Sequence, residues 1–303
     1  MEIIIDKERE GKTVLEILKK ELGLSSKMIT ALKKKENGIT VDKAHVTVRY
    51  ILKEDQLLAI DTEDTESNEN LLPTEMPLDI VFEDDDILLI NKPPMLPTHP
   101  SHGHFDDTLA NGVCFYMRQK GAFPFVFRSI NRLDRDTSGL VLIAKNRLSA
   151  SRLYSSMRNG LISKKYIALL CGELTKQSGT VDTYIRRKQK SIITREVCGP
   201  LHDAARAVTE YNVIAASKDL TAVVASPKTG RTHQLRLHFS YLGAPIMGDE
   251  LYGSASNTIG RQALHAFSLT FPHPTLGKVI TFKAPLPRDM KTAAELHHIK
   301  IEV

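Results

Sequence analysis

An acidic, polar segment divides this chain into two units that must fold separately. Residues 61–76 read DTEDTESNENLLPTEM, with few apolar side chains and no Lys or Arg. Such a composition cannot bury enough apolar surface to offset the entropy of ordering, and its like charges repel one another. We therefore expect a linker at 61–76 between a small domain over residues 1–60 and a large domain over residues 77–303.

The small unit has the pattern of two helices followed by a hairpin. Apolar residues at helical spacing predict a helix over 14–22, and the GLSS sequence at 23–26 ends it and caps a second helix over 27–35. Residues 38–42 and 46–50 have the alternation of short strands around an Asp-Lys turn. A basic edge is expected at the end of the second helix, from Lys33, Lys34 and Lys35.

Apolar runs of strand length dominate the large unit. The pattern predicts strands at 80–82, 87–91, 140–145, 166–171, 208–214 and 220–225, and helices at 147–159 and 231–241. Gly160 follows the first of these helices and would end it. Because helices do not alternate strictly with strands, the order favours an α+β fold with a mixed, largely antiparallel sheet over a doubly wound parallel sheet.

Charge is distributed unevenly along the chain. Residues 61–86 hold 11 Asp/Glu and no Lys/Arg, whereas residues 87–303 hold 29 Lys/Arg against 15 Asp/Glu. A positive excess of this size favours a polyanionic partner, because each neutralised phosphate releases counterions. A solvated basic surface is the alternative, so charge by itself only favours a nucleic acid.

Cysteine usage and hydropathy favour a cytoplasmic location. Cys114, Cys171 and Cys198 are widely spaced and have no metal-ligand pattern, so reduced thiols are expected. The apolar run near the N-terminus is three residues long, too short for a signal peptide, and no later stretch approaches a membrane span. We expect a soluble monomer in the cytoplasm, without a membrane partner.

The segment 129–146, SINRLDRDTSGLVLIAKN, has the pattern of a reactive site. Polar residues and a glycine lead directly into a five-residue apolar strand, where a rigid scaffold can hold a reactive group. Asp134 and Asp136 would face opposite ways on extended backbone, so they should not form an acid–base pair. One is expected to be functional and the other structural, capping the turn through the amides of Thr137 and Ser138. A salt-bridged surface turn fits these residues equally well.

A basic segment follows the Thr-Gly turn at 229–230. Arg231, His233, Gln234 and Arg236 stand at the start of the expected helix, where they could hold a carboxylate or a phosphate. The alternative is an ordinary basic amphipathic helix with its leucines partly in the core.

An aromatic residue follows two lysines at the start of another expected strand. Tyr166 in this position can stack on a base while Lys164 and Lys165 bind phosphates. A tyrosine of the core or of a sheet edge is the commoner role for such a residue.

No motif in the sequence calls for a metal or a cofactor. The acidic run at 83–86 lacks the spacing and the glycine of a calcium loop, so a solvated turn is favoured. His233 and His238 lie five residues apart on the expected helix, which is poor geometry for a shared metal. His265 and His273 have no acidic partners at useful spacing in the sequence.

Together these segments resemble the RluA/RluD-type RNA pseudouridine synthases. Residues 12–60 resemble, more weakly, the small RNA-binding domain named after the fourth protein of the small ribosomal subunit. The matching runs of the large unit occur in the order of the family: RLDRDTSGL at 132–140, KKYIA at 164–168, GRTHQLRLH at 230–238, PIMGDELYG at 245–253 and RQALHA at 261–266.

The resemblance implies a sheet with a central RNA-binding cleft, isomerisation of uridine within RNA, and no cofactor. It implies that Asp134 is the essential carboxylate, that Tyr166 packs against the target base and that Arg236 pairs with Asp134. Arg132 occupies a position associated with displacing the flipped-out nucleotide. Asn131 departs from the histidine that many members have there. Other RNA contacts are expected at Lys33, Lys34, Lys35, Lys165, Arg231, His233 and Gln234.

Two other functions stay open at this point. One is a non-catalytic RNA-binding or ribosome-assembly protein on the same scaffold. The other is a carboxylate-dependent hydrolase, which needs a second carboxylate facing the first that the spacing does not supply. For an isomerase, the appended RNA-binding domain favours ribosomal RNA of the large subunit as substrate, with transfer RNA as the alternative.

Overall fold

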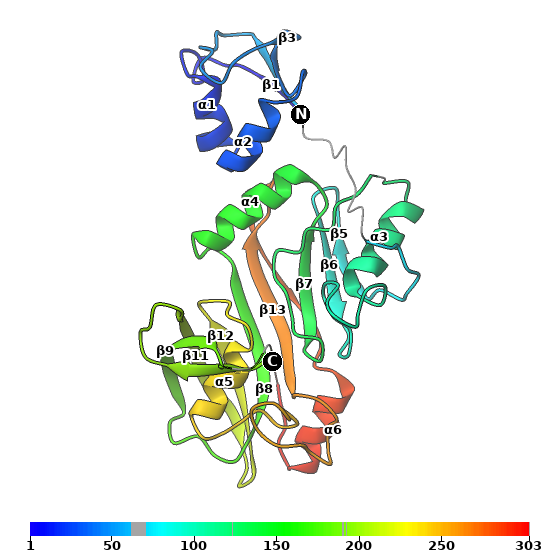
Figure 1. Cartoon of the computed structure of the whole chain (residues 1–303), viewed down its shortest axis with the longest axis vertical. Coiled ribbons are helices and arrows are strands. Elements are labelled where there is room, and N and C mark those ends of the chain that lie inside the picture. Colours follow the sequence, from blue (N-terminus) through cyan, green and yellow to red (C-terminus); the bar gives the residue numbers. More distant parts are fainter. Residues whose placement is uncertain (62–70, 123, 190, 192, 303) are drawn as a thin grey trace.

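The computed structural model describes residues 1–61, 71–122, 124–189, 191 and 193–302 (Figure 1). Within these residues the chain forms a four-stranded sheet near the N-terminus and a ten-stranded sheet in the rest of the molecule. Each sheet has an apolar core of its own. Most of the expected linker, at 62–70, lies outside the described residues.

The N-terminal sheet is antiparallel, with strand order β1-β4-β2-β3. Three helical segments pack against it and share its core. The elements of this part are β1 (Glu2–Ile4), α1 (Val14–Glu16), the π-helix η1 (Ile17–Glu21), α2 (Ser26–Leu32), β2 (Ile39–Val41), β3 (Ala44–His45) and β4 (Leu57–Ile60).

Local turn chemistry sets the bounds of these elements. The side chains of Thr13 and Ser25 cap the starts of α1 and α2. Asp42 and Lys43 both have positive φ, 50° and 69°, as a two-residue hairpin turn of type I′ requires. The returning strand therefore follows the turn at once as β3, and the predicted strand at 46–50 is wrong.

Contacts between the N-terminal part and the large unit are carried by α4 (Arg147–Arg158), which lies between them in Figure 1. The backbone N–H of Ser25 donates to the Ser151 hydroxyl over 3.0 Å, and Arg152 Nε donates to the Leu22 carbonyl over 3.1 Å. Leu148 packs against the apolar core of the N-terminal part. The N-terminal part thus packs on one helix of the large unit.

The last residues of the expected linker belong to the large unit. Residues 71–76 lie against α3 (Leu109–Gln119), where Asn111 Nδ2 donates to the Leu72 carbonyl over 2.7 Å. The backbone N–H of Thr74 donates back to the Asn111 carbonyl over 3.2 Å, and Leu71 packs on the large core. Residues that the sequence pattern assigned to the linker therefore contact a helix of the large unit that the pattern did not reveal.

The large sheet is mixed and mostly antiparallel. Its strand order is β10-β9-β11-β12-β8-β13-β7-β6-β5, and β14 pairs with β13. Only the contact of β13 with β7 is parallel among the pairs of described strands. Its strands are β5 (Ile80–Glu83), β6 (Ile87–Lys92), β7 (Ser138–Ala144), β8 (Ser163–Cys171), β9 (Ser178–Arg187), β10 (Arg195–Cys198), β11 (Ala205–Ala216), β12 (Leu220–Pro227), β13 (Leu264–Pro272) and β14 (Val279–Lys283). The predicted sheet class is confirmed.

The centre of the sheet is covered on both faces. Every residue of β7 is buried, and its side chains alternate between two cores, with Val141 and Ile143 in one and Leu140 and Leu142 in the other. A strand buried on both faces reads as a continuous apolar run rather than an alternating one. Because β7 is so fixed, the polar loop that precedes it has a rigid support.

A close approach of two backbones explains the glycine at the start of β7. Gly139 pairs in parallel with Ala266 of β13 and has φ of 115°. A methyl group at Gly139 would lie 2.3 Å from the Ala266 carbonyl oxygen. Only glycine combines this backbone angle with so close a contact.

Two further helices complete the large unit, α5 (Gln234–Tyr241) and α6 (Arg288–Leu296). The helix predicted from residue 231 begins three residues later, because His233 has φ of 56° and stands before the first helical turn. Arg231 and His233 therefore lie in a loop, not on the face of a helix. Among the described residues, no helix is both long and apolar enough to cross a membrane.

Candidate active site

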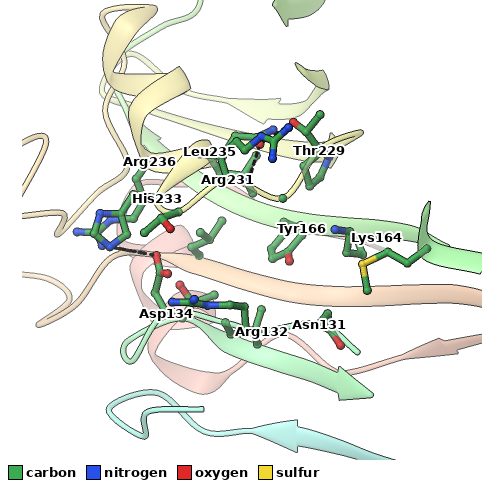
Figure 2. A pocket seen from close by; sticks show the side chains of 18 of the residues that line it. Asn131, Arg132, Asp134, Lys164, Tyr166, Thr229, Arg231, His233, Leu235 and Arg236 are labelled. Carbon is green, nitrogen blue, oxygen red and sulfur yellow. Dashed lines mark hydrogen bonds and ion pairs between the residues drawn. The ribbon is translucent and has the colours of Figure 1, made fainter. Parts of the chain in front are cut away.

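Three segments that are far apart in the sequence surround one cavity (Figure 2). The cavity has a volume of about 380 Å³, and its walls include the loop before β7, the first residues of β8 and the loop between β12 and α5. Tyr154 and Met157 of α4 add to the wall. The structure thus brings together the three motifs that the sequence singled out.

Backbone hydrogen bonds hold the loop that carries Asp134. The N–H of Thr137 donates to the Asp134 carbonyl over 3.1 Å and closes a turn. The buried ammonium of Lys92 donates to the Arg135 carbonyl over 2.9 Å and to two carbonyls of its own loop. The carboxylate is therefore placed by a loop whose ends are tied to β6 and β7.

Asn131 adds a second tie between this loop and β7. Its Nδ2 donates to the Leu140 carbonyl, and its Oδ1 accepts from the N–H of Leu142, each over 2.9 Å. The side-chain amide thereby pairs with β7 as another strand would. A histidine ring has no carbonyl oxygen for the second bond, so this chain supports its loop in its own way.

Asp134 lies beside two basic side chains at the cavity. Its Oδ2 is 3.6 Å from Arg236 Nη1 and 4.0 Å from His233 Nε2. The expected pairing with Arg236 is thus present but long. The shorter contacts of Arg236 are with Asp249, whose two oxygens accept from Nε and Nη2 over 2.7 Å each.

The Arg236–Asp249 pair is a buried anchor that the sequence did not single out. The Asp249 carboxylate is inaccessible to solvent and also accepts from the N–H groups of Leu251 and Tyr252. The guanidinium lies over the Tyr252 ring, 5.2 Å from its centroid. Its orientation toward Asp134 is therefore set by groups on its far side. The run PIMGDELYG was the only signal for this anchor.

Tyr166 faces the cavity from β8 and is 8% exposed. Burial raises the pKa of its hydroxyl, and the nearby Asp134 charge raises it further. The phenol therefore stays protonated near neutral pH. A neutral aromatic ring beside a carboxylate presents a flat apolar surface to a planar ligand.

The expected RNA contacts in the loop before β7 and in the α5 segment differ in their exposure to solvent. Arg132 and Arg231 line the cavity and are exposed. His233 lines it too, with Nδ1 2.8 Å from the Tyr252 hydroxyl, and burial lowers its pKa so that the ring is neutral near pH 7. Gln234 is buried, and its amide is bound to groups of β11 and of its own loop. Its observed contacts are those of a structural residue.

The expected lysine contacts are not gathered at the cavity. Lys165 is exposed and does not line it, whereas Lys164 does, because alternate residues of β8 point to the same face. Lys33, Lys34 and Lys35 lie beyond the end of α2, which stops at Leu32, and belong to the N-terminal part. Lys35 is paired there with Asp61 over 2.8 Å.

Asp136 does not cap the turn as expected. Its carboxylate accepts from the guanidinium of the adjacent Arg135 over 2.8 Å and 3.1 Å. The amide of Thr137 donates to the Asp134 backbone carbonyl instead. The turn is closed by backbone groups, so Asp136 forms a local ion pair and Asp134 is the carboxylate at the cavity.

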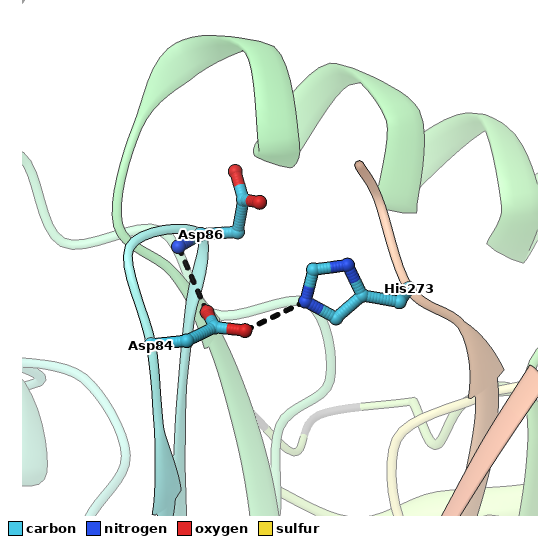
Figure 3. A group of neighbouring side chains, drawn as sticks. All are labelled: Asp84, Asp86 and His273. Carbon is cyan, nitrogen blue, oxygen red and sulfur yellow. Dashed lines mark hydrogen bonds and ion pairs between the residues drawn. The ribbon is translucent and has the colours of Figure 1, made fainter. Parts of the chain in front are cut away.

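His273 has acidic partners, contrary to the sequence analysis (Figure 3). Its Nε2 lies 2.7 Å from Asp84 Oδ2, and Asp86 is near enough for the three residues to form a potential metal site. Each ligand atom already has a partner, however. His273 Nδ1 accepts from the N–H groups of Thr275 and Leu276, and Asp86 accepts from Ser149 at the start of α4. These hydrogen bonds connect the turn at residues 84–86, the turn after His273 and the start of α4, which are far apart in the sequence.

The fold and the cavity define a class of protein, an enzyme with a mixed sheet whose basic cavity surrounds one carboxylate. The model of the family described as RNA pseudouridylate synthase matches residues 86–241. The uncharacterized RNA pseudouridine synthase YjbO of Bacillus subtilis is 43% identical over 270 residues, which cover 89% of this chain and 94% of that protein. Ribosomal large subunit pseudouridine synthase D of Zymomonas mobilis is 36% identical over 72% of each chain.

Solved structures agree with this assignment. Human RNA pseudouridylate synthase domain containing 1 has a TM-score of 0.58 and 30% identity, over 69% of this chain and 83% of that chain. A second human protein, RNA pseudouridylate synthase domain containing 4, has a TM-score of 0.62 over 73% of this chain and 94% of its own, and its 23% identity supports the fold alone. The chain belongs to the RNA pseudouridylate synthase family and is an isomerase that acts on RNA, as the motifs predicted.

Proposed function

We propose that this protein isomerises specific uridines in structured RNA, with ribosomal RNA of the large subunit as its substrate and Asp134 as the required carboxylate. The observation that carries the proposal is the cavity in which Asp134 lies 3.6 Å from Arg236 and faces the buried Tyr166. The guanidinium opposes the penalty for burying the carboxylate charge.

The reaction fits a site of this kind. The bond between N1 of uracil and C1′ of the ribose breaks, C5 becomes bonded to C1′, the C5 proton leaves and N1 gains a proton. Atoms and electrons balance without a further reactant. Asp134 acts either by attack on the sugar or by removal of a proton from it. In both cases Tyr166 would pack against the uracil while it is detached and turned.

The substrate must leave its stack before it can reach Asp134. Extruding a nucleotide has an unstacking cost of a few kcal/mol. Arg132 is exposed at the cavity, where it can take the place of the displaced nucleotide. Such basic contacts help to offset the unstacking cost.

The choice of ribosomal RNA rests on two observations. Relatives at 33–36% identity, from Pseudomonas aeruginosa and Zymomonas mobilis among others, are named ribosomal large subunit pseudouridine synthase D. Residues 1–60 form a separate sheet with Lys33 and Lys34 exposed, and we propose this part as an RNA-binding domain beside a catalytic domain that begins at residue 71. A monomer that works in the cytoplasm, and transfer RNA as alternative substrate, stay predictions.

The test is the variant Asp134→Asn, expressed in a strain that lacks the gene. Carbodiimide mapping of ribosomal and transfer RNA should show one or more pseudouridines that the wild-type protein restores and the variant does not. RNA binding by the variant should be largely retained, because the asparagine keeps the shape of the loop. Full restoration by Asp134→Asn would contradict the catalytic role, and a change confined to transfer RNA would replace the substrate assignment.

A further inference from the structure

The cavity holds more positive charge than its own carboxylate can balance. Asp134 is the only acid among the described residues that line it. Arg236 faces Asp134 but is already paired with Asp249. Three other cationic residues lie in the wall, and none of them has an acidic partner there: Arg132, Lys164 and Arg231. A cavity with this imbalance fits an anionic ligand.

Lys164 is the least expected of these three cations. It precedes Tyr166 by two residues on β8, so both side chains face the cavity. Burial lowers the pKa of its ammonium. Among the described residues, none forms a hydrogen bond or an ion pair with the ammonium of Lys164. A half-buried lysine without a partner is disfavoured in the free protein, and an anion bound beside it would remove that penalty.

The ammonium of Lys164 points to the mouth of the cavity. A methyl group at Gly230 would lie 3.7 Å from Lys164 Nζ, which places the ammonium under the loop between β12 and α5. Gly230 and the neighbouring Arg231 are exposed. In Figure 2 the Lys164 side chain lies beyond Tyr166 as seen from Asp134, and Arg231 lies above Tyr166, next to Thr229.

A hydrogen bond to a backbone carbonyl orients the Arg231 side chain and leaves its two Nη groups available to a ligand. Its Nε donates to the Arg206 carbonyl over 3.0 Å, and its Nη groups form no hydrogen bond with any described residue. A guanidinium held in this way presents two donors in a fixed geometry, which suits a phosphate. Lys164 and Arg231 thus both line the cavity without an acidic partner, and like charges in one cavity repel each other unless an anion lies between them.

We propose that Lys164 and Arg231 form a subsite for the backbone phosphate next to the uridine that is isomerised. The inference rests on the proposed function and adds to it. A uracil packed on Tyr166 reaches the interior of the cavity, whereas its phosphate stays at the mouth, where the two cations lie. Of the two lysines that the sequence analysis gave a phosphate role, only Lys164 lines the cavity.

The first test measures RNA binding at several salt concentrations. Lys164→Met keeps the apolar stem and removes the charge. With a short oligouridylate as probe, it should weaken binding by about tenfold and reduce the slope of log Kd against log salt by about 0.7, the value for one phosphate contact in a single strand. Arg231→Met should act similarly. The double variant should lose less than the product of the two losses, because both cations bind one phosphate.

Lys165→Met is the matched comparison, since it removes the same charge one residue away on the other face of β8. Its effect should be about twofold or less. Equal losses of RNA affinity for Lys164→Met and Lys165→Met would show that only the net charge of the protein matters, and this would contradict the subsite. Lys164→Arg should keep most of the binding, and thermal unfolding of each variant checks that it is folded.

The second test removes the charge from the RNA instead. A synthetic stem–loop that contains the mapped uridine is made with a neutral methylphosphonate at the linkage on its 5′ side or on its 3′ side. One of the two should weaken binding to the wild-type protein by about tenfold and weaken binding to Lys164→Met by less, because only Arg231 is left to contact that phosphate. If each neutral linkage weakens binding to Lys164→Met as much as binding to the wild-type protein, the ammonium contacts neither phosphate and the proposal fails.

The two proposals fail in different ways. If the wild-type protein forms no pseudouridine in ribosomal RNA, the substrate assignment falls, while the oligouridylate measurement still decides on the subsite. If pseudouridine forms normally and Lys164→Met binds as the wild type does, only the subsite is wrong.

Discussion

At the scale of single residues, the site depends on how one arginine is shared between two carboxylates. Arg236 makes its two short contacts with Asp249 and a longer one with Asp134. Asp249 therefore acts as a positioning residue, because it fixes the guanidinium from the side away from the cavity. Asp134 keeps a nearby positive charge without a tight pair that a substrate would have to break.

Asp249→Asn should strongly destabilise the folded protein although it leaves Asp134 in place. It keeps the shape of the side chain but leaves the buried guanidinium of Arg236 without its closest counter-charge. The free energy of unfolding should fall by about 3–5 kcal/mol, as for other broken buried pairs, and can be measured by urea unfolding.

Asp289→Asn provides the control for this substitution. Asp289 also binds a buried arginine, Arg261, through two oxygens, but the Asp289 side chain is 38% exposed and Arg261 also donates to backbone carbonyls, so the loss should be smaller, about 1–2 kcal/mol. Equal losses for the two variants would show that burial of the pair is not what makes Asp249 important.

At the scale of elements, the parallel contact of β7 with β13 positions the loop of Asp134. β7 is buried along its whole length, and its first residues pair with His265 and Ala266. Arg261, close to the start of β13, donates to the Asp136 carbonyl over 3.0 Å. The loop is thus supported from the strand behind it as well as from its own ends.

Gly139→Ala should disturb this contact more than its size suggests. The new methyl group would meet the backbone of Ala266, which cannot move without breaking the pairing of β7 with β13. We expect a loss of about 3 kcal/mol or more in the free energy of unfolding. Pseudouridine formation should fall as well, because the loop of Asp134 shifts with the strand.

Gly160→Ala separates the effect of the close contact from that of the backbone angle. Gly160 also has positive φ, 71°, but open space surrounds the position of a methyl group. Its loss should be about 1–2 kcal/mol, the ordinary penalty of a left-handed residue, with activity unchanged at a temperature where the variant is folded. A comparable loss in Gly139→Ala would contradict the role given to the close contact.

At the scale of the whole molecule, α4 connects the N-terminal part with the cavity. Leu148, Ser151 and Arg152 contact the N-terminal part, while Tyr154 and Met157 of the same helix line the cavity. The hydrogen bonds of Asp84, Asp86 and His273 support the start of this helix. An RNA bound by the N-terminal part would therefore lie close to the wall of the active site.

Removal of residues 1–61 should separate binding from chemistry. The cores of the large unit contain no residue from this part, so residues 62–303 should stay folded and turn over a short stem–loop at a rate similar to that of the full chain. Affinity for long ribosomal RNA should fall by about 10²-fold, the scale of a lost second binding module. Loss of turnover on the short RNA would show instead that the N-terminal part shapes the cavity through α4.

Much of the site could be predicted from local sequence because its residues lie in compact motifs. The pattern of RLDRDTSGL indicated a polar loop before a buried strand, and the family resemblance singled out Asp134 within it. Lys165 was expected among the RNA contacts, but Lys164 is the lysine that lines the cavity, because the face that a strand turns to a cavity depends on its register with its neighbours.

By itself, the sequence determined the sheet class, six of the ten strands of the large sheet, and the three segments of the site, because apolar periodicity and turn residues act over a few neighbours. The tertiary structure decided which atoms meet. It pairs Arg236 with Asp249, places His273 beside Asp84 and Asp86, and places Lys164 in the wall of the cavity. Such contacts join residues far apart in the chain, and no local pattern records them.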